Sequence, residues 1–285
     1  MTRQPAVARR AEQLLGTAVV STAPVAGGDI ATATKLRLND GTMALMKTLP
    51  HPPEGFFAAE ARGLRWLAEP GAALVPEVLA DEQDCLIIRW IEPGRPSPEA
   101  AEALGRSLAA LHRAGAEGFG APEDGFIGRL PMPNRSAPTW AEFYAVRRLL
   151  PYLKLAHDRG ALEYDEAAAI ETLVGRLTTL LPEEPPARLH GDLWNGNVLW
   201  DRDGGAWLID PAAYGGHREV DLAMLSLFGL PHLDRVLAAY QDVAPLAEGW
   251  ESRVALHQLF PLLVHAATFG GGYGARAAEV ARGYL

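Results

Sequence analysis

The sequence predicts an α+β protein of two lobes: a small lobe with an antiparallel sheet and one helix, and a larger, mainly helical lobe. Three observations predict it. Short apolar and β-branched runs fill the first 91 residues, a proline- and glycine-rich break follows at 93–98, and apolar residues then recur at helical spacing. We therefore expect one lobe over residues 1–91 and a second over residues 92–285, in line with the length of 285 residues.

The elements of the small lobe follow from apolar runs and turn residues. Asn39-Asp40-Gly41 is typical of a tight turn between two strands. Phe56, Phe57, Leu64 and Leu67 recur at helical spacing and predict one helix. The expected strands are Val19–Val25, Ala31–Leu38, Thr42–Thr48, Val75–Leu79 and Cys85–Ile91, and the expected helix is Glu54–Ala68.

The second lobe begins with a capped helix. Ser97 is a suitable N-cap with Pro98 at the first helical position, and an apolar stripe runs from Ala100 to Leu111. An irregular segment, residues 189–211, holds two strand-like pieces. The other expected helices are Trp140–Leu153, Leu162–Leu181, Val220–Phe228, Leu233–Tyr240 and Glu251–Phe269.

Composition excludes several classes of protein. Hydrophobic residues make up 48% and charged residues 21%, as in ordinary globular proteins, and the net charge of −9 argues against a nucleic-acid partner. Cys85 is the only cysteine, which excludes an intramolecular disulfide. No secretory signal is visible, and the uncharged stretch Val254–Ala275 is interrupted by polar residues, so we interpret it as a buried helix with a glycine-rich stop. We expect no membrane contact, a cytoplasmic location, and a monomer or weak dimer.

The segment His190 to Asn197 carries the strongest chemical signal. Asp192 is followed five residues later by Asn197, in a glycine-containing loop, and Asp210 comes eighteen residues after Asp192 at the end of an apolar run. An aspartate and an asparagine at this offset match the catalytic loop of protein kinases, and a carboxylate after a strand can hold a metal beside phosphates. The alternative is that Asp192 and Asn197 stabilise turns and Asp210 caps a strand. The combination favours phosphoryl transfer.

The small lobe tests that interpretation independently. Glu60 lies in the middle of the apolar face of the expected helix, where a lone carboxylate is costly, so it needs a cationic partner. Lys47, at the end of a strand, is the obvious one, as in the kinase pair that positions nucleotide phosphates. Gly27 and Gly28 lie in a predicted turn, where backbone amides can approach phosphate oxygens. The alternatives are a surface lysine with an outward glutamate, and an ordinary turn.

With these residues, the chain resembles the fructosamine kinase family, also called ketosamine-3-kinases, within the protein-kinase-like and aminoglycoside-phosphotransferase-like group. The similarity runs from about Gly27 to Tyr273. The Asp–Asn offset alone indicates only a kinase-like phosphotransferase, whereas its form with Trp194, together with the stretch after Asp210, is narrower. The other stretches that carry the resemblance are Gly27 to Ile30, Phe57 to Leu64, Gly125 to Gly128, Trp140 to Tyr144, Arg147 to Leu149, Tyr214 to Glu219 and His265 to Gly270.

The resemblance implies a role for each matching residue. It makes Asp192 the catalytic base, Asn197 and Asp210 the magnesium ligands, and Lys47 with Glu60 the pair that positions the phosphates of ATP. It places Arg89, Trp90 and Ile91 at the hinge, whose backbone contacts adenine. Asp221 would brace the backbone of the catalytic loop. Trp194, His265 and His217 are candidates for sugar contacts. The alternative for Trp194 is a core position under the loop, and for the two histidines it is the more common case of a core histidine with satisfied hydrogen bonds.

The family transfers the γ-phosphate of ATP to the 3-hydroxyl group of a ketosamine, a sugar carried on a free amine or a protein lysine, and the phosphate is then eliminated to release the amine. The resemblance therefore implies deglycation repair. The alternatives are an aminoglycoside- or choline-type kinase and a catalytically silent nucleotide-binding module. Many members have a cysteine where Asp29 stands here, and Cys85 falls in an apolar strand. We therefore expect no redox response.

Overall fold

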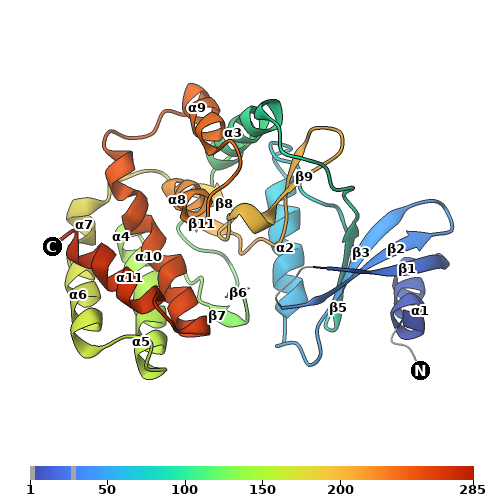
Figure 1. The fold of residues 1–285 in the computed structure, drawn as a ribbon, viewed down its shortest axis with the longest axis horizontal. Coiled ribbons are helices and arrows are strands. Elements are labelled where there is room, and N and C mark those ends of the chain that lie inside the picture. Colours follow the sequence, from blue (N-terminus) through green and yellow to red (C-terminus); the bar gives the residue numbers. More distant parts are fainter. Residues whose placement is uncertain (1–3, 27–29) are drawn as a thin grey trace.

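The computed structural model describes residues 4–26 and 30–285, and it has the two lobes and the α+β class predicted above (Figure 1). The small lobe is built on one antiparallel sheet with the strand order β1-β2-β3-β5-β4. Each strand except β4 lies within two residues of its predicted bounds. The strands are β1 (Val19–Val25), β2 (Thr32–Leu38), β3 (Met43–Thr48), β4 (Val78–Glu82) and β5 (Cys85–Arg89).

Two helices cover the two faces of this sheet, where the sequence predicted one. Helix α1 (Gln4–Leu15) packs on the face that carries Ile87. Helix α2 (Phe56–Ala68) packs on the opposite face, that of Leu86 and Ile88. Because side chains alternate along a strand, the unbroken apolar run of β5 supplies both faces. The prediction of a single helix is wrong because α1 covers the second face.

Strand β4 also differs from its prediction. The predicted strand Val75–Leu79 contains Pro76, which has no N–H to donate to a ladder. The observed strand begins two residues after that proline and pairs Val78 with Ile88.

The large lobe is mainly helical, and its first helix starts as predicted. The Oγ of Ser97 accepts a hydrogen bond from the amide of Ala100 at 3.1 Å. The predicted helix Leu162–Leu181 is divided near Gly175, and the one beginning at Trp140 contains a π-helical turn over Tyr144–Leu149. The helices are α3 (Pro98–Arg113), α4 (Trp140–Phe143), α5 (Leu150–Asp158), α6 (Tyr164–Val174), α7 (Leu177–Leu180), α8 (Glu219–Leu227), α9 (Leu233–Val243), α10 (Trp250–Phe269) and α11 (Tyr273–Arg282).

Three two-stranded antiparallel sheets complete the large lobe in the described part of the chain. The two strand-like pieces predicted within residues 189–211 are β9 and β10, which pair antiparallel after a 3₁₀ turn at Asn195–Asn197. The other pairs are β6 with β7 and β8 with β11. The bounds are β6 (Gly125–Ile127), β7 (Leu130–Met132), β8 (Ala187–Leu189), β9 (Val198–Trp200), β10 (Ala206–Leu208) and β11 (Tyr214–Gly216).

Helix α10 accounts for the uncharged stretch in the sequence. It is buried along most of its length and ends at Gly270, which has a φ of 66°. Across residues 4–26 and 30–285, none of the helices combines the length and the apolarity that a membrane crossing needs.

Candidate active site

A cleft of about 2120 Å³ lies between the lobes and is lined by both. Pockets for one small molecule usually measure about 300–1,000 Å³, so this cleft has room for two substrates. His217 is not part of its wall, and Gly27 and Gly28 lie outside the described residues. The predicted site residues that line it are Lys47, Glu60, Arg89, Trp90, Ile91, Asp192, Trp194, Asn197, Asp210 and His265.

The loop that carries Asp192 is held by a buried carboxylate. Asp221 accepts the amide hydrogens of His190 at 2.8 Å and of Gly191 at 2.9 Å, which confirms that it braces this loop. Gly191 has a φ of 83°, and a Cβ there would lie 2.0 Å from the carbonyl oxygen of Ala212. Only glycine fits this position, so the chain can turn sharply just before Asp192.

His190 connects the loop to the strand that leads to Asp210. Its Nδ1 accepts the amide hydrogen of Asp192 at 3.3 Å, and its Nε2 donates to the carbonyl of Ile209 at 2.8 Å. Burial lowers the pKa of His190, so the ring is neutral with its proton on Nε2, as these two bonds require. The amide of Ile209 in turn donates to the carbonyl of Asn197 at 3.0 Å. These bonds hold Asp192, Asn197 and Asp210 together.

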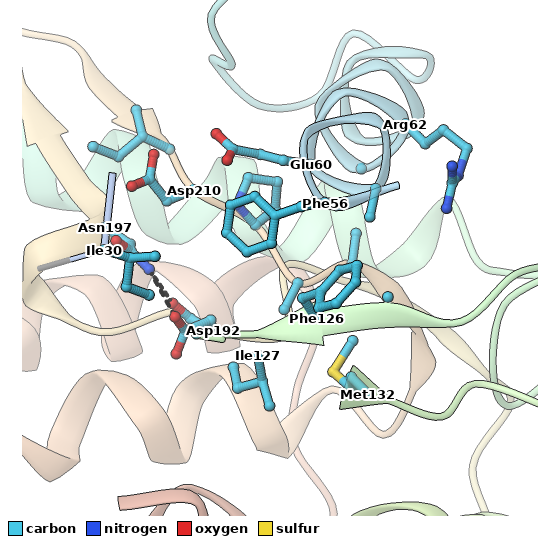
Figure 2. A pocket seen from close by; sticks show the side chains of 18 of the residues that line it. Ile30, Phe56, Glu60, Arg62, Phe126, Ile127, Met132, Asp192, Asn197 and Asp210 are labelled. Carbon is cyan, nitrogen blue, oxygen red and sulfur yellow. Dashed lines mark hydrogen bonds between the residues drawn. The ribbon is translucent and has the colours of Figure 1, made fainter. Parts of the chain in front are cut away.

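The side chains of Asp192, Asn197 and Asp210 lie on one side of the cleft (Figure 2). Glu60 extends toward them from α2. The amide nitrogen of Asn197 donates to Asp192 at its carbonyl oxygen (2.8 Å) and at Oδ2 (3.2 Å), so the amide oxygen is left for another partner. Asp210 adopts a φ of 55°, which is uncommon for a residue other than glycine. An amide oxygen and a carboxylate are the donors that Mg²⁺ prefers, so Asn197 and Asp210 fit a magnesium ion.

The electrostatics of Asp192 are also typical of a functional site. Burial and the nearby carboxylate of Asp210 together raise the pKa of Asp192 to about 7. Both effects disfavour the charged form of the carboxyl group. Carboxyl groups perturbed in this way cluster in catalytic clefts.

The predicted ion pair of the small lobe is present. The Nζ of Lys47 lies 2.6 Å from Glu60 Oε1 and 3.0 Å from Asp210 Oδ1. Burial opposes the charge of Lys47, but the two carboxylates outweigh it and hold its pKa above the ordinary value. Lys47 therefore connects α2 to Asp210 on the other side of the cleft while remaining charged.

The segment after β5 fits a hinge. The amide hydrogens of Arg89 and Trp90 are already used by the carbonyls of Glu77 (2.8 Å) and Met43 (3.0 Å). The amide of Ile91 donates to no backbone acceptor in the described part of the chain. Of the three predicted hinge residues, Ile91 is the one with a donor available to a ligand.

Helix α2 is attached to the large lobe at its first half. Phe56 of α2 contacts Phe126 of the β6–β7 hairpin, with 5.3 Å between ring centroids and 57° between the ring planes, and the two rings lie near each other in Figure 2. Arg62 on the same helix forms an ion pair with Glu123 at 3.1 Å.

Its second half is attached as well. A Cβ at Gly63 would lie 3.2 Å from the Pro211 side chain, so this glycine lets α2 approach the segment after Asp210 closely. Further along, Arg188 of the large lobe forms an ion pair with Glu69 at 2.9 Å and lies over the ring of Trp66. The helix that carries Glu60 is therefore in contact with both lobes.

His217 does not belong to this site. It is fully buried, its Nδ1 accepts the amide hydrogen of Glu219, and its ring stacks on that of His257 at 5.1 Å. The predicted sugar contact by His217 is therefore wrong, because the packing of α8 against α10 encloses the ring. His217, Glu219 and His257 lie close enough to suggest a metal site. However, Arg253 binds both carboxylate oxygens of Glu219, at 2.6 and 2.9 Å, and this positive charge opposes a cation.

Sequence reasoning missed several cleft residues on the side of Trp194 and His265. Phe228, Phe269 and Tyr273 line the cleft there. Phe228 and Phe269 each stand just before a glycine at a helix end, a position where a side chain often stays exposed. That signal is weak, and their meeting depends on how α8, α10 and α11 pack.

Comparison with known proteins gives a consistent result. The family model described as fructosamine kinase matches residues 3–285. A probable ketoamine kinase of Thermus thermophilus is 41% identical over 251 residues, which is 88% of this chain and 88% of that protein. A chloroplastic protein-ribulosamine 3-kinase of Arabidopsis thaliana is 33% identical over 281 residues, 94% of this chain and 84% of that protein.

A solved structure is also similar over nearly the whole chain. It comes from Thermobifida fusca, and its proposed activity is that of a fructosamine-3-kinase. The two chains share 51% identity with a TM-score of 0.93, over 97% of each chain.

Proposed function

The chain belongs to the fructosamine kinase family and is thus a phosphotransferase, and from this premise we propose that it uses ATP and magnesium to phosphorylate the 3-hydroxyl group of ketosamines. The observation that carries the proposal is that Lys47, Glu60, Asp192, Asn197 and Asp210 all line one cleft, with Lys47 in contact with both Glu60 and Asp210. We propose a cytoplasmic location on the same ground, since ATP is the phosphate donor.

Each residue has a role in this reaction. Asp192 orients the 3-hydroxyl group and accepts its proton as the oxygen bonds to the γ-phosphorus and the bond to ADP breaks. Lys47, held by Glu60, binds the phosphates. The amide of Ile91 is available to the adenine. Asn197 and Asp210 would hold the magnesium ion, which supplies positive charge to the phosphates when bound.

The product chemistry gives the reaction its biological sense. A phosphate at the 3-position of a ketosamine is a good leaving group: its elimination after enolisation leaves an imine at C1, and water hydrolyses this imine to a dicarbonyl sugar and the free amine. The proposed role is therefore deglycation, the removal of sugars from amines. The name of the Arabidopsis relative, which is 33% identical, supports a ribulosamine as one acceptor.

A screen for ADP release tests the proposal. Purified protein with ATP and Mg²⁺ is offered ribulosyl- and fructosyl-amines, aminoglycosides and choline, with Asp192→Asn as the control for contaminating kinases. We expect ADP release with ketosamines only, and phosphate at the 3-hydroxyl group by NMR.

The same screen separates the alternatives. ADP release with an aminoglycoside or choline and none with ketosamines would identify a different small-molecule kinase on this fold. Nucleotide binding without ADP release from any acceptor would identify a catalytically silent module.

A further inference from the structure

Five aromatic side chains form a continuous row along one wall of the cleft. We define the aromatic row as Trp194, Phe228, His265, Phe269 and Tyr273, which come from the catalytic loop, the end of α8, α10 and the start of α11. The ring centroids of Trp194 and Phe228 are 5.8 Å apart, and those of Phe228 and His265 are 5.3 Å apart. His265 lies 5.6 Å from Phe269 and 5.1 Å from Tyr273. The row therefore leads away from the catalytic loop.

Two of these rings are exposed to solvent. Phe228 is 42% exposed and Phe269 is 67% exposed, although both line the cleft. Exposed apolar surface that gathers in a concave site marks a place where a ligand binds.

Two other rings are fixed in place. The ring of Trp194 lies against the backbone of Gly196, because a Cβ at that glycine would come within 2.3 Å of it. His265 is bonded through Nδ1 to the carbonyl of Pro261 at 2.6 Å. Because a carbonyl only accepts, Nδ1 carries the proton and the orientation of this ring is set. The row is thus a preformed surface.

The charge along α10 narrows the chemistry of the ligand. The cleft residues of this helix are Val264, His265, Thr268 and Phe269, and none of them is an aspartate, glutamate, lysine or arginine. Arg159, a cation that also lines the cleft, donates through Nη1 to the carbonyl of Ala267 at 2.5 Å. The wall formed by α10 suits carbon chains and rings.

The length of the row exceeds the sugar that the reaction needs. The 3-hydroxyl group must reach Asp192, and Trp194, two residues further along the chain, borders that place. One sugar ring is about as wide as one aromatic ring, so a sugar beside Trp194 leaves the far end of the row, at Phe269 and Tyr273, uncovered. In a ketosamine the amine is attached at C1, which is separated from C3 by C2 alone. The group on the amine therefore leaves the sugar close to the reacting hydroxyl and can follow the row.

Resting on the proposed function, we propose that the aromatic row binds the amine-side group of the ketosamine and selects acceptors in which this group is an apolar chain or ring. A lysyl side chain and a free alkyl or aromatic amine share this chemistry. A carboxylate close to the amine would be rejected, because it would lose its hydration against apolar rings.

A series of acceptors with one sugar tests this selection. The sugar is attached to methylamine, propylamine, pentylamine and glycine, and kcat/KM is measured at saturating ATP. We expect kcat/KM to rise by about threefold for each added methylene, which is somewhat less than full burial would give. The glycine adduct should fall below the methylamine adduct.

Variants at the mouth of the row identify the residues responsible. Phe269→Ala should flatten the rise with chain length, whereas Phe269→Leu, which keeps an apolar side chain, should retain most of it. Tyr164→Ala is the matched control, since Tyr164 is an aromatic residue that is 83% exposed and lies outside the cleft. The KM for ATP should be unchanged in all three variants.

The two sources of the apolar group are distinguished by one further acceptor, a short peptide with the sugar on its lysine. A kcat/KM similar to that of the pentylamine adduct means that the row binds lysyl chains of proteins. A much lower value, with the rise along the amine series intact, means that it binds free amines.

Two outcomes would count against these ideas in different ways. If all ketosamines are phosphorylated with equal kcat/KM, or if Phe269→Ala keeps the full rise, the role of the aromatic row is refuted and the proposed function stands. If no ketosamine is phosphorylated, the proposed function is wrong.

Discussion

The substitution Asp221→Asn would remove one acceptor from beneath the catalytic loop. Asp221 is fully buried, and its two oxygens accept the amide hydrogens of His190 and Gly191 at 2.8 and 2.9 Å. The Nε2 of His112 also lies 3.2 Å from Oδ2 of Asp221. Asparagine has one accepting oxygen, so one amide N–H would face an NH₂ group instead.

The magnitude follows from these bonds. A buried N–H without an acceptor costs about 1–3 kcal/mol. The hydrogen bond that remains is weaker, because its acceptor is a neutral amide oxygen and no longer a charged carboxylate. We therefore expect the free energy of unfolding to fall by about 2–4 kcal/mol. Because Asp192 directly follows Gly191, the carboxylate of Asp192, the proposed base, should also move. A displacement of this kind should lower kcat by about 10- to 100-fold. The KM for ATP should change little, because Lys47, which we propose binds the phosphates, lies in the small lobe.

Urea denaturation measures the first effect, and ADP release from the best acceptor measures the second at a temperature where both proteins are folded. Asp165→Asn is the control, because Asp165 is an exposed aspartate that forms an ion pair with Arg282 at 2.8 Å. It should change stability by less than about 1 kcal/mol. The reasoning is refuted if Asp221→Asn is no more destabilising than the control, or if it lowers stability while kcat stays at the wild-type value.

Three other predictions concern the site and the single thiol. Asp192→Asn should lower kcat by about 10²-fold or more while the KM for ATP changes little, and near-normal turnover would exclude a role as base. Lys47→Met and Glu60→Gln, alone and combined, should show a coupling of about 1–3 kcal/mol in kcat/KM for ATP, because Lys47→Met leaves the buried carboxylate of Glu60 unpaired and Glu60→Gln leaves Lys47 with Asp210 as its one carboxylate partner; additive effects would mean that the pair does not act as a unit. Burial raises the pKa of Cys85 to about 11, so mild peroxide should leave activity unchanged in the folded protein and should oxidise the thiol only after denaturation; a reversible loss of activity that depends on Cys85 would contradict this.

The small-lobe strands could be predicted because local sequence determines most of their pairing. The turn at Asn39-Asp40-Gly41 joins two alternating runs, and β2 and β3 pair on either side of it. Helix α1 was missed although Val7, Ala11 and Leu14 repeat at helical spacing and pack on the sheet. The unbroken apolar run of β5 already indicated a sheet covered on both faces, and hence a second covering element.

The positions of the candidate site residues were predictable where these residues lie in one segment or on one helix face. Asp192 and Asn197 are close in sequence, and the position of Glu60 on an apolar face required a cation. The burial of His217 could not be predicted, because it depends on His257 from a helix 40 residues away. Of the aromatic row, only Trp194 and His265 were identified as site residues from the sequence, because the other rings come from helix ends whose packing no local pattern describes.

Helix α2 has a consequence for how the protein is controlled. In protein kinases, the helix that carries the glutamate of the lysine–glutamate pair can swing away, and its position is used as a switch. Here that movement would break the Phe56–Phe126 contact and the Arg62–Glu123 and Arg188–Glu69 ion pairs, each worth up to about 1 kcal/mol.

The swung-out form would therefore be a minor species, and the pair is assembled before any ligand arrives. Because the Lys47–Glu60 pair is already formed, this enzyme needs no activating movement of α2. The rate would then depend on the supply of acceptor and ATP alone, which would suit the proposed deglycation activity.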